Sequence, residues 1–269
     1  MSGRPKRRLG QHFLTDPNIL GRIADMTGAG PEDTVLEIGP GPGGLTALLA
    51  ARAGRLVAIE KDAELVPALR ARFPAATIVE GDALDLDWHA EAGRPAAGRF
   101  IIAGNIPYNI TSPLIDLALA PPLPARFVFL VQKEVAIRLG AGPGSSDYGA
   151  LSVGVQAVAR VERLFTVPAG AFAPPPKVDS AVVRMTPLEE PLVADADRAS
   201  FRRMVVGLFG LRRKQLLRGV RELTGWDPAR AGSVLAASGI ASTVRPETLE
   251  PVRFVALHRA LVDAGWVAR

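Results

Sequence analysis

Short apolar runs alternate with stretches of helical periodicity over the first two thirds of the chain. Runs such as Thr34–Ile38, Arg55–Ile59 and Phe127–Val131 predict buried strands. Between such runs, apolar positions recur at helical spacing, and one such segment opens on Asp16 and Pro17, an N-cap acid followed by proline. Strands that alternate with helices predict a parallel, doubly wound α/β sheet, which binds ligands at the carboxyl ends of its strands.

The same pattern predicts the other elements and the domains. The expected strands are Thr34–Ile38, Arg55–Ile59, Ala76–Val79, Phe100–Ala103, Phe127–Val131, Val161–Val167 and Val178–Met185. One expected helix starts at Pro17, and a second is capped by Asp62 and runs to about Arg72. The others are Leu45–Ala53, Pro113–Ala120, Lys133–Leu139 and Tyr148–Ala159. The acid- and proline-rich stretch Pro187–Asp197 predicts a linker, and helical periodicity fills Ala199–Arg269. We therefore expect a main domain over residues 1–187, with a basic N-terminal arm, and a small helical RNA-binding domain over residues 188–269.

Composition excludes several kinds of chemistry. The chain has 269 residues, 48% of them hydrophobic, which is enough for a large core. It has no cysteine, so a disulfide framework, a thiolate zinc site and a cysteine nucleophile are excluded. Its three histidines are far apart in sequence, so we expect no metal. The apolar runs are too short to cross a membrane, and no apolar run follows the basic first residues as it would in a signal peptide, so we expect a cytoplasmic protein with no membrane partner.

Positive charge is concentrated in two segments. Residues 1–10 contain four cations and residues 201–221 contain seven, and neither segment contains an acid. The rest of the chain has 27 acidic residues against 21 basic ones. Concentrated positive charge favours a polyanionic partner, either nucleic acid or an acidic membrane surface, although a solvated cationic helix face would give the same pattern.

A glycine-rich loop, residues 39–44, follows the first expected strand and leads into a helix. Glycine lets the backbone approach a ligand, and the helix N-terminus attracts anions. Glu60 ends the next strand, where a carboxylate can accept both hydroxyl groups of a ribose. The glycine-rich loop and Glu60 together fit an enzyme that binds a dinucleotide or one that uses S-adenosylmethionine. Pro42 departs from the dinucleotide fingerprint, and Asp82, at the end of the third strand, can accept from an adenine amino group, so the methyl donor is favoured.

The sequence Asn105-Ile106-Pro107-Tyr108 follows the fourth strand, at the same edge of the sheet. An exocyclic amine is a poor nucleophile because its lone pair is delocalised into the ring. Hydrogen-bond acceptors placed against its N–H groups draw the nitrogen toward a tetrahedral geometry. The Asn105 side chain and the Ile106 carbonyl can supply these acceptors. Tyr108 can stack on an extruded base. A strand-end turn with a core tyrosine is the alternative.

The chain resembles the KsgA-type small-subunit (16S) ribosomal RNA adenine N6,N6-dimethyltransferases over nearly its full length. The matching motifs are Gly10–Leu14, Glu37–Gly44, Gly81–Ala83, Asn105–Tyr108, Val131–Val135, Phe172–Ser180 and Phe209–Leu217. The resemblance implies a class I methyltransferase fold. It also implies an enzyme that uses S-adenosylmethionine, releases S-adenosylhomocysteine and dimethylates two adjacent adenosines in the 3′-terminal hairpin of small-subunit rRNA, within a 30S assembly precursor.

The resemblance also implies roles for individual residues. The expected cofactor contacts are His12, Leu14, Gly39, Gly41, Glu60, Asp82 and Asn105. The expected catalytic residues are Asn105, Tyr108 and Phe172, with Phe172 stacked on the opposite face of the target base from Tyr108. The family often has asparagine at the position of His12. On the helical domain, five basic residues are expected to contact RNA phosphates: Arg202, Arg203, Arg212, Arg213 and Lys214. Arg4–Arg8 are expected to form an arm over the RNA. Nothing in the sequence indicates an obligate oligomer, so we expect a monomer.

Three alternatives remain open from the sequence. The related large-subunit rRNA methyltransferases of the macrolide-resistance type share the glycine loop and the asparagine–aromatic turn. A nucleic-acid-binding factor could keep the fold without catalysis. A dinucleotide oxidoreductase is disfavoured because no catalytic tyrosine–lysine pair is evident.

Overall fold

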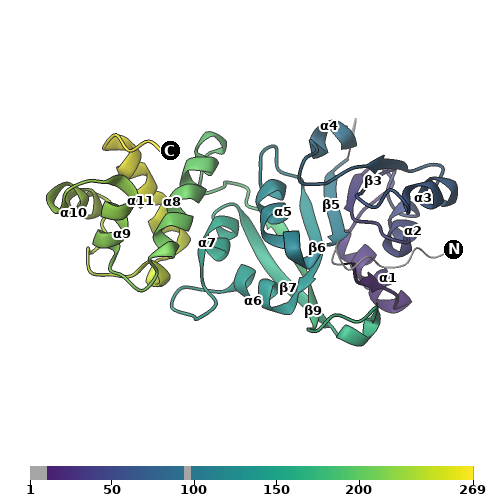
Figure 1. Cartoon of the computed structure of the whole chain (residues 1–269). Helices are drawn as coiled ribbons and strands as arrows, with labels where there is room; N and C mark the ends of the chain where they lie inside the picture. The colour runs from purple at the N-terminus through teal and green to yellow at the C-terminus, as the bar shows by residue number, and fades with distance from the viewer. Residues whose placement is uncertain (1–10, 94–97, 269) are drawn as a thin grey trace. The chain divides into compact units, whose positions relative to one another are not determined.

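A computed structural model describes residues 11–93 and 98–268, and the chain forms two compact units (Figure 1). The first unit comprises residues 1–136 and 161–187, and the second comprises residues 137–160 and 188–269. The chain passes from the first unit to the second after residue 187, where a boundary was expected. Residues 137–160, however, fold with the C-terminal helices and not with the first unit. The reason is packing, because Tyr148 is fully buried in the helical core and its hydroxyl donates to the Leu249 carbonyl at 2.7 Å.

The first unit is built on a seven-stranded sheet in the order β4-β3-β2-β5-β6-β9-β7. Its strands are β2 (Thr34–Ile38), β3 (Arg55–Glu60), β4 (Thr77–Glu80), β5 (Phe100–Asn105), β6 (Arg126–Gln132), β7 (Ala159–Val167) and β9 (Ser180–Pro187). The first five strands in that order, from β4 to β6, are parallel to their neighbours, and β9 pairs antiparallel with β6. The expected doubly wound, mostly parallel sheet is confirmed, and the predicted strands match within one or two residues.

Helices connect these strands and cover the sheet. In the first unit they are α1 (Pro17–Thr27), α2 (Gly44–Ala50), α3 (Val66–Arg72), α4 (Trp88–Ala92) and α5 (Thr111–Ala118), and α6 (Lys133–Gly140) spans the junction of the units. Helix α1 begins as expected, because the Asp16 side chain accepts hydrogen bonds from the backbone N–H groups of Asn18 and Ile19. The sequence pattern missed α4 and a two-stranded sheet of β1 (Phe13–Leu14) and β8 (Phe172–Ala173). These elements are too short to show a period.

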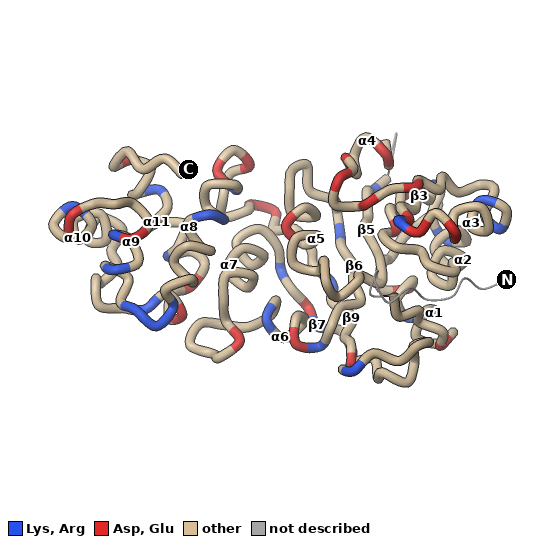
Figure 2. Tube along the Cα trace, viewed as in Figure 1, with Lys and Arg blue, Asp and Glu red and all other residues tan. Residues whose placement is uncertain are grey.

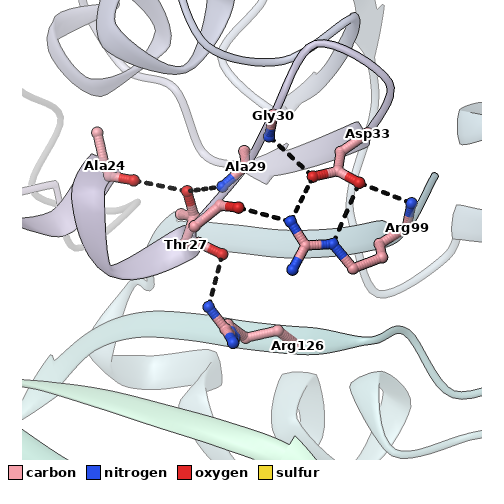
Figure 3. Close-up of polar contacts among 8 residues, drawn as sticks. Ala24, Thr27, Ala29, Gly30, Asp33, Arg99 and Arg126 are labelled. Atoms are coloured by element: carbon pink, nitrogen blue, oxygen red, sulfur yellow. Dashed lines mark hydrogen bonds and ion pairs between the residues drawn. The ribbon is translucent and has the colours of Figure 1, made fainter.

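A polar cluster fixes the relative position of β2 and β5 at the end of the sheet where both strands begin (Figure 3). Asp33 precedes β2, and its carboxylate accepts from the backbone N–H and from the guanidinium of Arg99, which precedes β5, with the Nη2–Oδ2 pair at 2.7 Å. Hydrogen bonds from Arg99, opposed in part by burial, lower the pKa of Asp33 to about 2. This contact supports the register that sets Ile38 opposite Gly104, so both strands end at the same level.

The second unit is helical, as the periodicity of its sequence predicts. It contains α7 (Ala150–Gln156), α8 (Arg198–Gly210), α9 (Leu216–Thr224), α10 (Pro228–Ala237) and α11 (Pro251–Asp263). Their apolar faces share one core around Leu208, Leu235 and Phe254. The stretch expected to be a linker is packed, because Val193 is only 3% exposed and belongs to this core. Among the helices described, none is long and apolar enough to cross a membrane.

Candidate active site

A cavity lies at the carboxyl edge of the sheet, within the first unit. It is bounded by the residues that follow β2, β3, β4 and β5 and by the segment before β1. The predicted site residues that line it are His12, Gly39, Gly41, Glu60, Asp82, Asn105 and Tyr108. Segments far apart in sequence therefore meet at the edge that the parallel sheet predicts.

The glycine loop takes a conformation that other residues rarely adopt. Gly39 and Gly41 have φ angles of 69° and 57°, in the left-handed region. A Cβ atom at Gly41 would lie 3.0 Å from the Phe13 ring. Glycine thus provides both the turn and the space in which the segment of β1 lies against the loop.

Glu60 holds the glycine loop to the end of β3. Its Oε2 accepts from the Gly41 N–H at 2.9 Å, and its Oε1 accepts from the Asp62 N–H at 2.8 Å. The residue is 4% exposed, and burial raises the pKa of its carboxyl group, while these hydrogen bonds act in the opposite direction. Each carboxylate oxygen has two lone-pair directions, so Glu60 keeps acceptor capacity toward the cavity.

Asp82 carries an ion pair that sequence analysis missed. Lys61, which directly follows Glu60, donates from Nζ to Asp82 Oδ2. Burial alone would raise the pKa of Asp82, but the hydrogen bonds from Lys61 and from the Leu84 N–H outweigh it and lower the pKa. Asp82 is therefore a carboxylate at neutral pH, with its charge balanced by a lysine that also lines the cavity. The cationic residue after Glu60 was the only signal of this pair in the sequence.

Glu37 lies beneath the glycine loop, on β2, and is 1% exposed. Burial raises the pKa of Glu37 to about 8, with a further contribution from the neighbouring charge of Glu60. Its Oε2 has no hydrogen-bond partner among the described residues. Glu37 is accordingly mostly protonated at neutral pH, so no full negative charge is buried beneath the glycine loop at this position.

The segment before β1 orients the Asn105 side chain. Asn105 donates from Nδ2 to the backbone carbonyl of His12 at 2.9 Å. A carbonyl oxygen can only accept, so this contact fixes which end of the amide faces His12 and directs Oδ1 the other way. His12 is itself held, since its Nδ1 lies 2.9 Å from the Pro174 carbonyl oxygen. Asn105 thus presents an acceptor that is set by a residue 93 positions away in sequence.

Tyr108 is positioned from two sides. Its hydroxyl lies 2.6 Å from the Ser180 Oγ at the start of β9, and its ring stacks with the His12 imidazole at a centroid separation of 5.5 Å and an interplanar angle of 25°. Burial raises the pKa of Tyr108, although the contact with Ser180 opposes the shift, so the phenol stays neutral. A neutral ring held in place is suited to stacking on a flat ligand.

Leu14 and Phe172 are not brought to the cavity. They are directly opposite each other in the pairing of β1 with β8, and they are 8% and 4% exposed. Both side chains belong to the core formed with Ile23, Leu45 and Val182. In this structure Phe172 therefore packs as a core aromatic, and the expected position beside a target base is not observed.

Of the five basic residues expected to contact RNA in the helical domain, the three at positions 212–214 divide into two kinds. Arg212 is half-buried and donates from Nε to Glu247 Oε2 at 2.6 Å, whereas Arg213 and Lys214 are exposed. Arg212 is thus neutralised by a partner within the second unit. The expected basic arm, Arg4–Arg8, lies outside the described residues.

The cavity therefore offers two buried or half-buried carboxyl groups, an oriented amide oxygen, a neutral phenol and close backbone approach. In residues 11–93 and 98–268, no three histidine, aspartate or glutamate side chains gather as a metal site would require. Cysteine is absent from the whole sequence. These groups can bind and orient hydrogen-bond donors, and they supply no covalent nucleophile of the cysteine type.

The sheet order and the cavity at its carboxyl edge define a class I methyltransferase. Comparison with known families makes the assignment specific, because residues 3–245 match the family described as Ribosomal RNA adenine dimethylase. The chain belongs to this family of rRNA adenine dimethyltransferases.

Relatives with curated names cover the chain almost completely. The Ribosomal RNA small subunit methyltransferase A of Geobacter sulfurreducens is 46% identical, over 97% of each chain. The protein of the same name from Pseudomonas syringae pv. tomato is 41% identical, over 97% of this chain and 96% of its own.

Solved structures give the same class. A dimethyladenosine transferase from Plasmodium falciparum superposes with a TM-score of 0.80 and 26% identity, over 94% of this chain and 98% of its own. The 23S rRNA methyltransferase ErmE has a TM-score of 0.67 and 28% identity, over 93% of this chain and 99% of its own.

Proposed function

We propose that the protein uses S-adenosylmethionine to dimethylate N6 of two adjacent adenosines in the 3′-terminal hairpin of small-subunit rRNA, within a 30S assembly precursor. One observation carries the proposal. The glycine loop, the carboxylates of Glu60 and Asp82, and the turn at Asn105 meet in one cavity of a chain that belongs to the rRNA adenine dimethylase family.

The residues of the cavity suit the polar groups of the donor. Glu60 would accept from the ribose hydroxyl groups, and Asp82 would accept from the adenine amino group once Lys61 yields that oxygen. Gly39 and Gly41 would let the methionine part approach the backbone. When bound, the donor supplies an electrophilic methyl group on a sulfonium sulfur.

The turn after β5 would activate the target amine. Asn105 Oδ1, directed away from His12, and the Ile106 carbonyl would each accept one N–H of the adenine amino group. Together they would localise the lone pair on nitrogen. The Ile106 backbone is itself held, because its N–H donates to the Leu130 carbonyl at 3.0 Å. No protein base is required, since the methylated product is acidic enough to lose its proton to water.

Tyr108 would hold the extruded base by stacking. In this structure one face of its ring is next to the His12 imidazole. A base could therefore use the other face, or could replace His12 in the stack. A second aromatic contact from Phe172 would require that residue to leave the core in which it is packed.

The choice of small-subunit RNA is supported by the relatives. Proteins named as small-subunit methyltransferases are 41% and 46% identical to this chain, against 28% for ErmE. The test is to incubate the enzyme with precursors of each subunit and tritiated donor, and to map the label by mass spectrometry of RNA fragments. We expect dimethyladenosine at two adjacent positions near the 3′ end of small-subunit RNA. Label in large-subunit RNA alone would contradict the proposal.

A further inference from the structure

Two depressions in the surface of the second unit meet at one tryptophan. The first lies between α8, the end of α9 and the C-terminal residues 265–268, and the second lies along α9. Gly225 and Trp226, which directly follow α9, line both. Apart from the phosphate contacts expected of Arg202 and Arg203, no role assigned above uses this surface, which we call the Trp226 groove.

The rim of the Trp226 groove is strongly cationic. Arg202 and Arg203 line the first depression, and Arg218 and Arg221 line the second. All four arginines are exposed. Glu222 is the one acid among the lining residues, and its carboxylate lies 3.6 Å from Arg218. Figure 2 shows Lys and Arg gathered along α9 and in the loop between α8 and α9. The charge therefore matches a polyanion that would run past Trp226 on both sides.

Trp226 is held as a rigid aromatic surface. The Arg230 guanidinium carbon lies 4.1 Å from the centre of its ring, and Arg230 Nη2 donates to the Ala264 carbonyl at 2.7 Å. The backbone N–H of Trp226 donates to Thr224 Oγ1 at 3.2 Å. A fixed cation covers one face of the indole and the side chain also packs against the helical core, while the residue remains half-buried and its remaining surface lines both depressions.

The lining of the groove includes apolar side chains and two helices that pack closely beside it. A Cβ atom at Gly207 would lie 2.9 Å from Leu223 Cδ1, so glycine lets α8 and α9 approach closely there. Val206 is 47% exposed and Val267 is 76% exposed, which is unusual for large apolar side chains. Phosphate contacts alone would require neither these apolar side chains nor the indole.

We propose that the Trp226 groove binds an unpaired segment of RNA, with one base stacked on Trp226 and the flanking phosphates on the arginines of the rim. Cationic grooves with an aromatic stacking surface bind single strands, whereas a duplex hides the faces of its bases. The inference rests on the proposed function only in that the substrate is RNA. It adds a second contact within the helical unit, separate from the residues that handle the target adenosine.

The test uses the full chain and a fluorescein-labelled ten-nucleotide oligouridylate, with an RNA duplex of equal length as the comparison. Trp226→Leu keeps an apolar side chain but removes the aromatic ring, and Trp226→Phe restores one. We expect Trp226→Leu to weaken single-strand binding about 5- to 100-fold, as loss of one stacked base does. We expect Trp226→Phe to recover most of the affinity, with little effect of either change on the duplex. Arg253→Ala, which removes an exposed arginine outside the groove, is the matched charge control.

Two further variants change only exposed arginines of the rim and leave the helical core intact. Arg203→Ala and Arg221→Ala should each lower the slope of log affinity against log salt by about 0.7, the value for one phosphate contact of a single strand. Unchanged single-strand binding in Trp226→Leu would overturn the inference. Equal losses of affinity for the single strand and the duplex would also overturn it. A loss of affinity seen only with protein-containing subunits, and not with naked RNA, would indicate a protein partner and would overturn it as well. Methylation of precursor subunits is measured separately, so wild-type enzyme that methylates no small-subunit RNA would contradict the proposed function alone.

Discussion

At the scale of single residues, the site depends on contacts that bring a side chain together with the backbone of a distant segment. Asn105 and Glu60 could be predicted from the sequence because each directly ends a strand. The orientation of Asn105 could not, because its partner is the carbonyl of His12, and a backbone group leaves no signal in residue identity. Phe172 shows the converse, since it belongs to a motif on which the family resemblance rests but its side chain is in the core.

Asn105→Ala should abolish methyl transfer, because it removes the acceptor for the target amine. Binding of S-adenosylhomocysteine should remain measurable by calorimetry, since Glu60 and Asp82 are untouched. Asn105→Asp is the matched control. It keeps an acceptor but places a carboxylate against the His12 carbonyl, so it should also lose most activity. Normal turnover in Asn105→Ala would remove this residue from the chemistry.

Glu37→Gln should change how stability depends on pH. The pKa of Glu37 is raised to about 8 in the folded protein, from an ordinary value of 4.5. The contribution of protonated Glu37 to the free energy of unfolding is therefore fully present below pH 4.5. It is lost as the pH rises through about 8. The loss is about 1.4 kcal/mol per pH unit while only the folded state holds the proton.

Denaturant unfolding at several pH values measures this effect. The difference between the unfolding free energies of Glu37→Gln and wild type should rise in favour of the variant between pH 5 and pH 8 and then level off. Gln keeps the size and polarity of the side chain, so packing is little changed. A difference that does not vary with pH would show that Glu37 titrates normally in the folded state.

At the scale of elements, long and buried strands were predictable and short pairings were not. The strands of the sheet have apolar runs, which their burial on both faces requires. The pairing of β1 with β8 covers only two residues in each strand, yet it fixes the segment that contains His12. Its formation depends on residues 158 and 160 positions apart, beyond the reach of any local pattern.

Gly104→Ala should disturb the turn that contains Asn105. A Cβ atom at Gly104 would lie 2.5 Å from the Ile38 carbonyl oxygen, so β5 would have to move away from β2. We expect a loss of stability of about 1–3 kcal/mol, in the range of overpacked cores, and a fall in the catalytic rate larger than the change in donor affinity. Thermal unfolding and single-turnover kinetics measure the two effects.

Gly21→Ala provides the control, because nothing lies within 4 Å of a Cβ atom at that position in α1. It should be neutral or stabilising by about 0.5–1 kcal/mol, as for an unobstructed helical glycine. If Gly104→Ala proved as benign as this control, the close approach of β5 to β2 would not set the position of the Asn105 turn.

At the scale of the whole molecule, charge was easier to predict than domain boundaries. The cationic stretch of residues 201–221 could be read from composition and is exposed at Arg213 and Lys214. The return of residues 137–160 to the C-terminal unit could not, because helical periodicity does not indicate which core a helix joins.

Arg213→Ala with Lys214→Ala should weaken RNA binding and lower the salt slope by about 0.7–0.9 per lost phosphate contact. Arg212→Ala should behave differently, because Arg212 is paired with Glu247. We expect it to lower the unfolding temperature, with a smaller change in the salt slope. Filter binding at several salt concentrations, combined with thermal unfolding, separates these roles. Equal salt slopes and equal unfolding temperatures for all these variants would contradict the different roles of Arg212 and of Arg213 with Lys214.

The interrupted second unit has a consequence for synthesis of the chain. Tyr148 leaves the ribosome 101 residues ahead of Leu249, to whose carbonyl it is bonded in the finished protein. Translation proceeds at about 5–20 residues per second, so Tyr148 and the helix α7 that follows it wait some seconds without the neighbours that will bury them. During that interval the apolar face of α7 is a natural target for a chaperone.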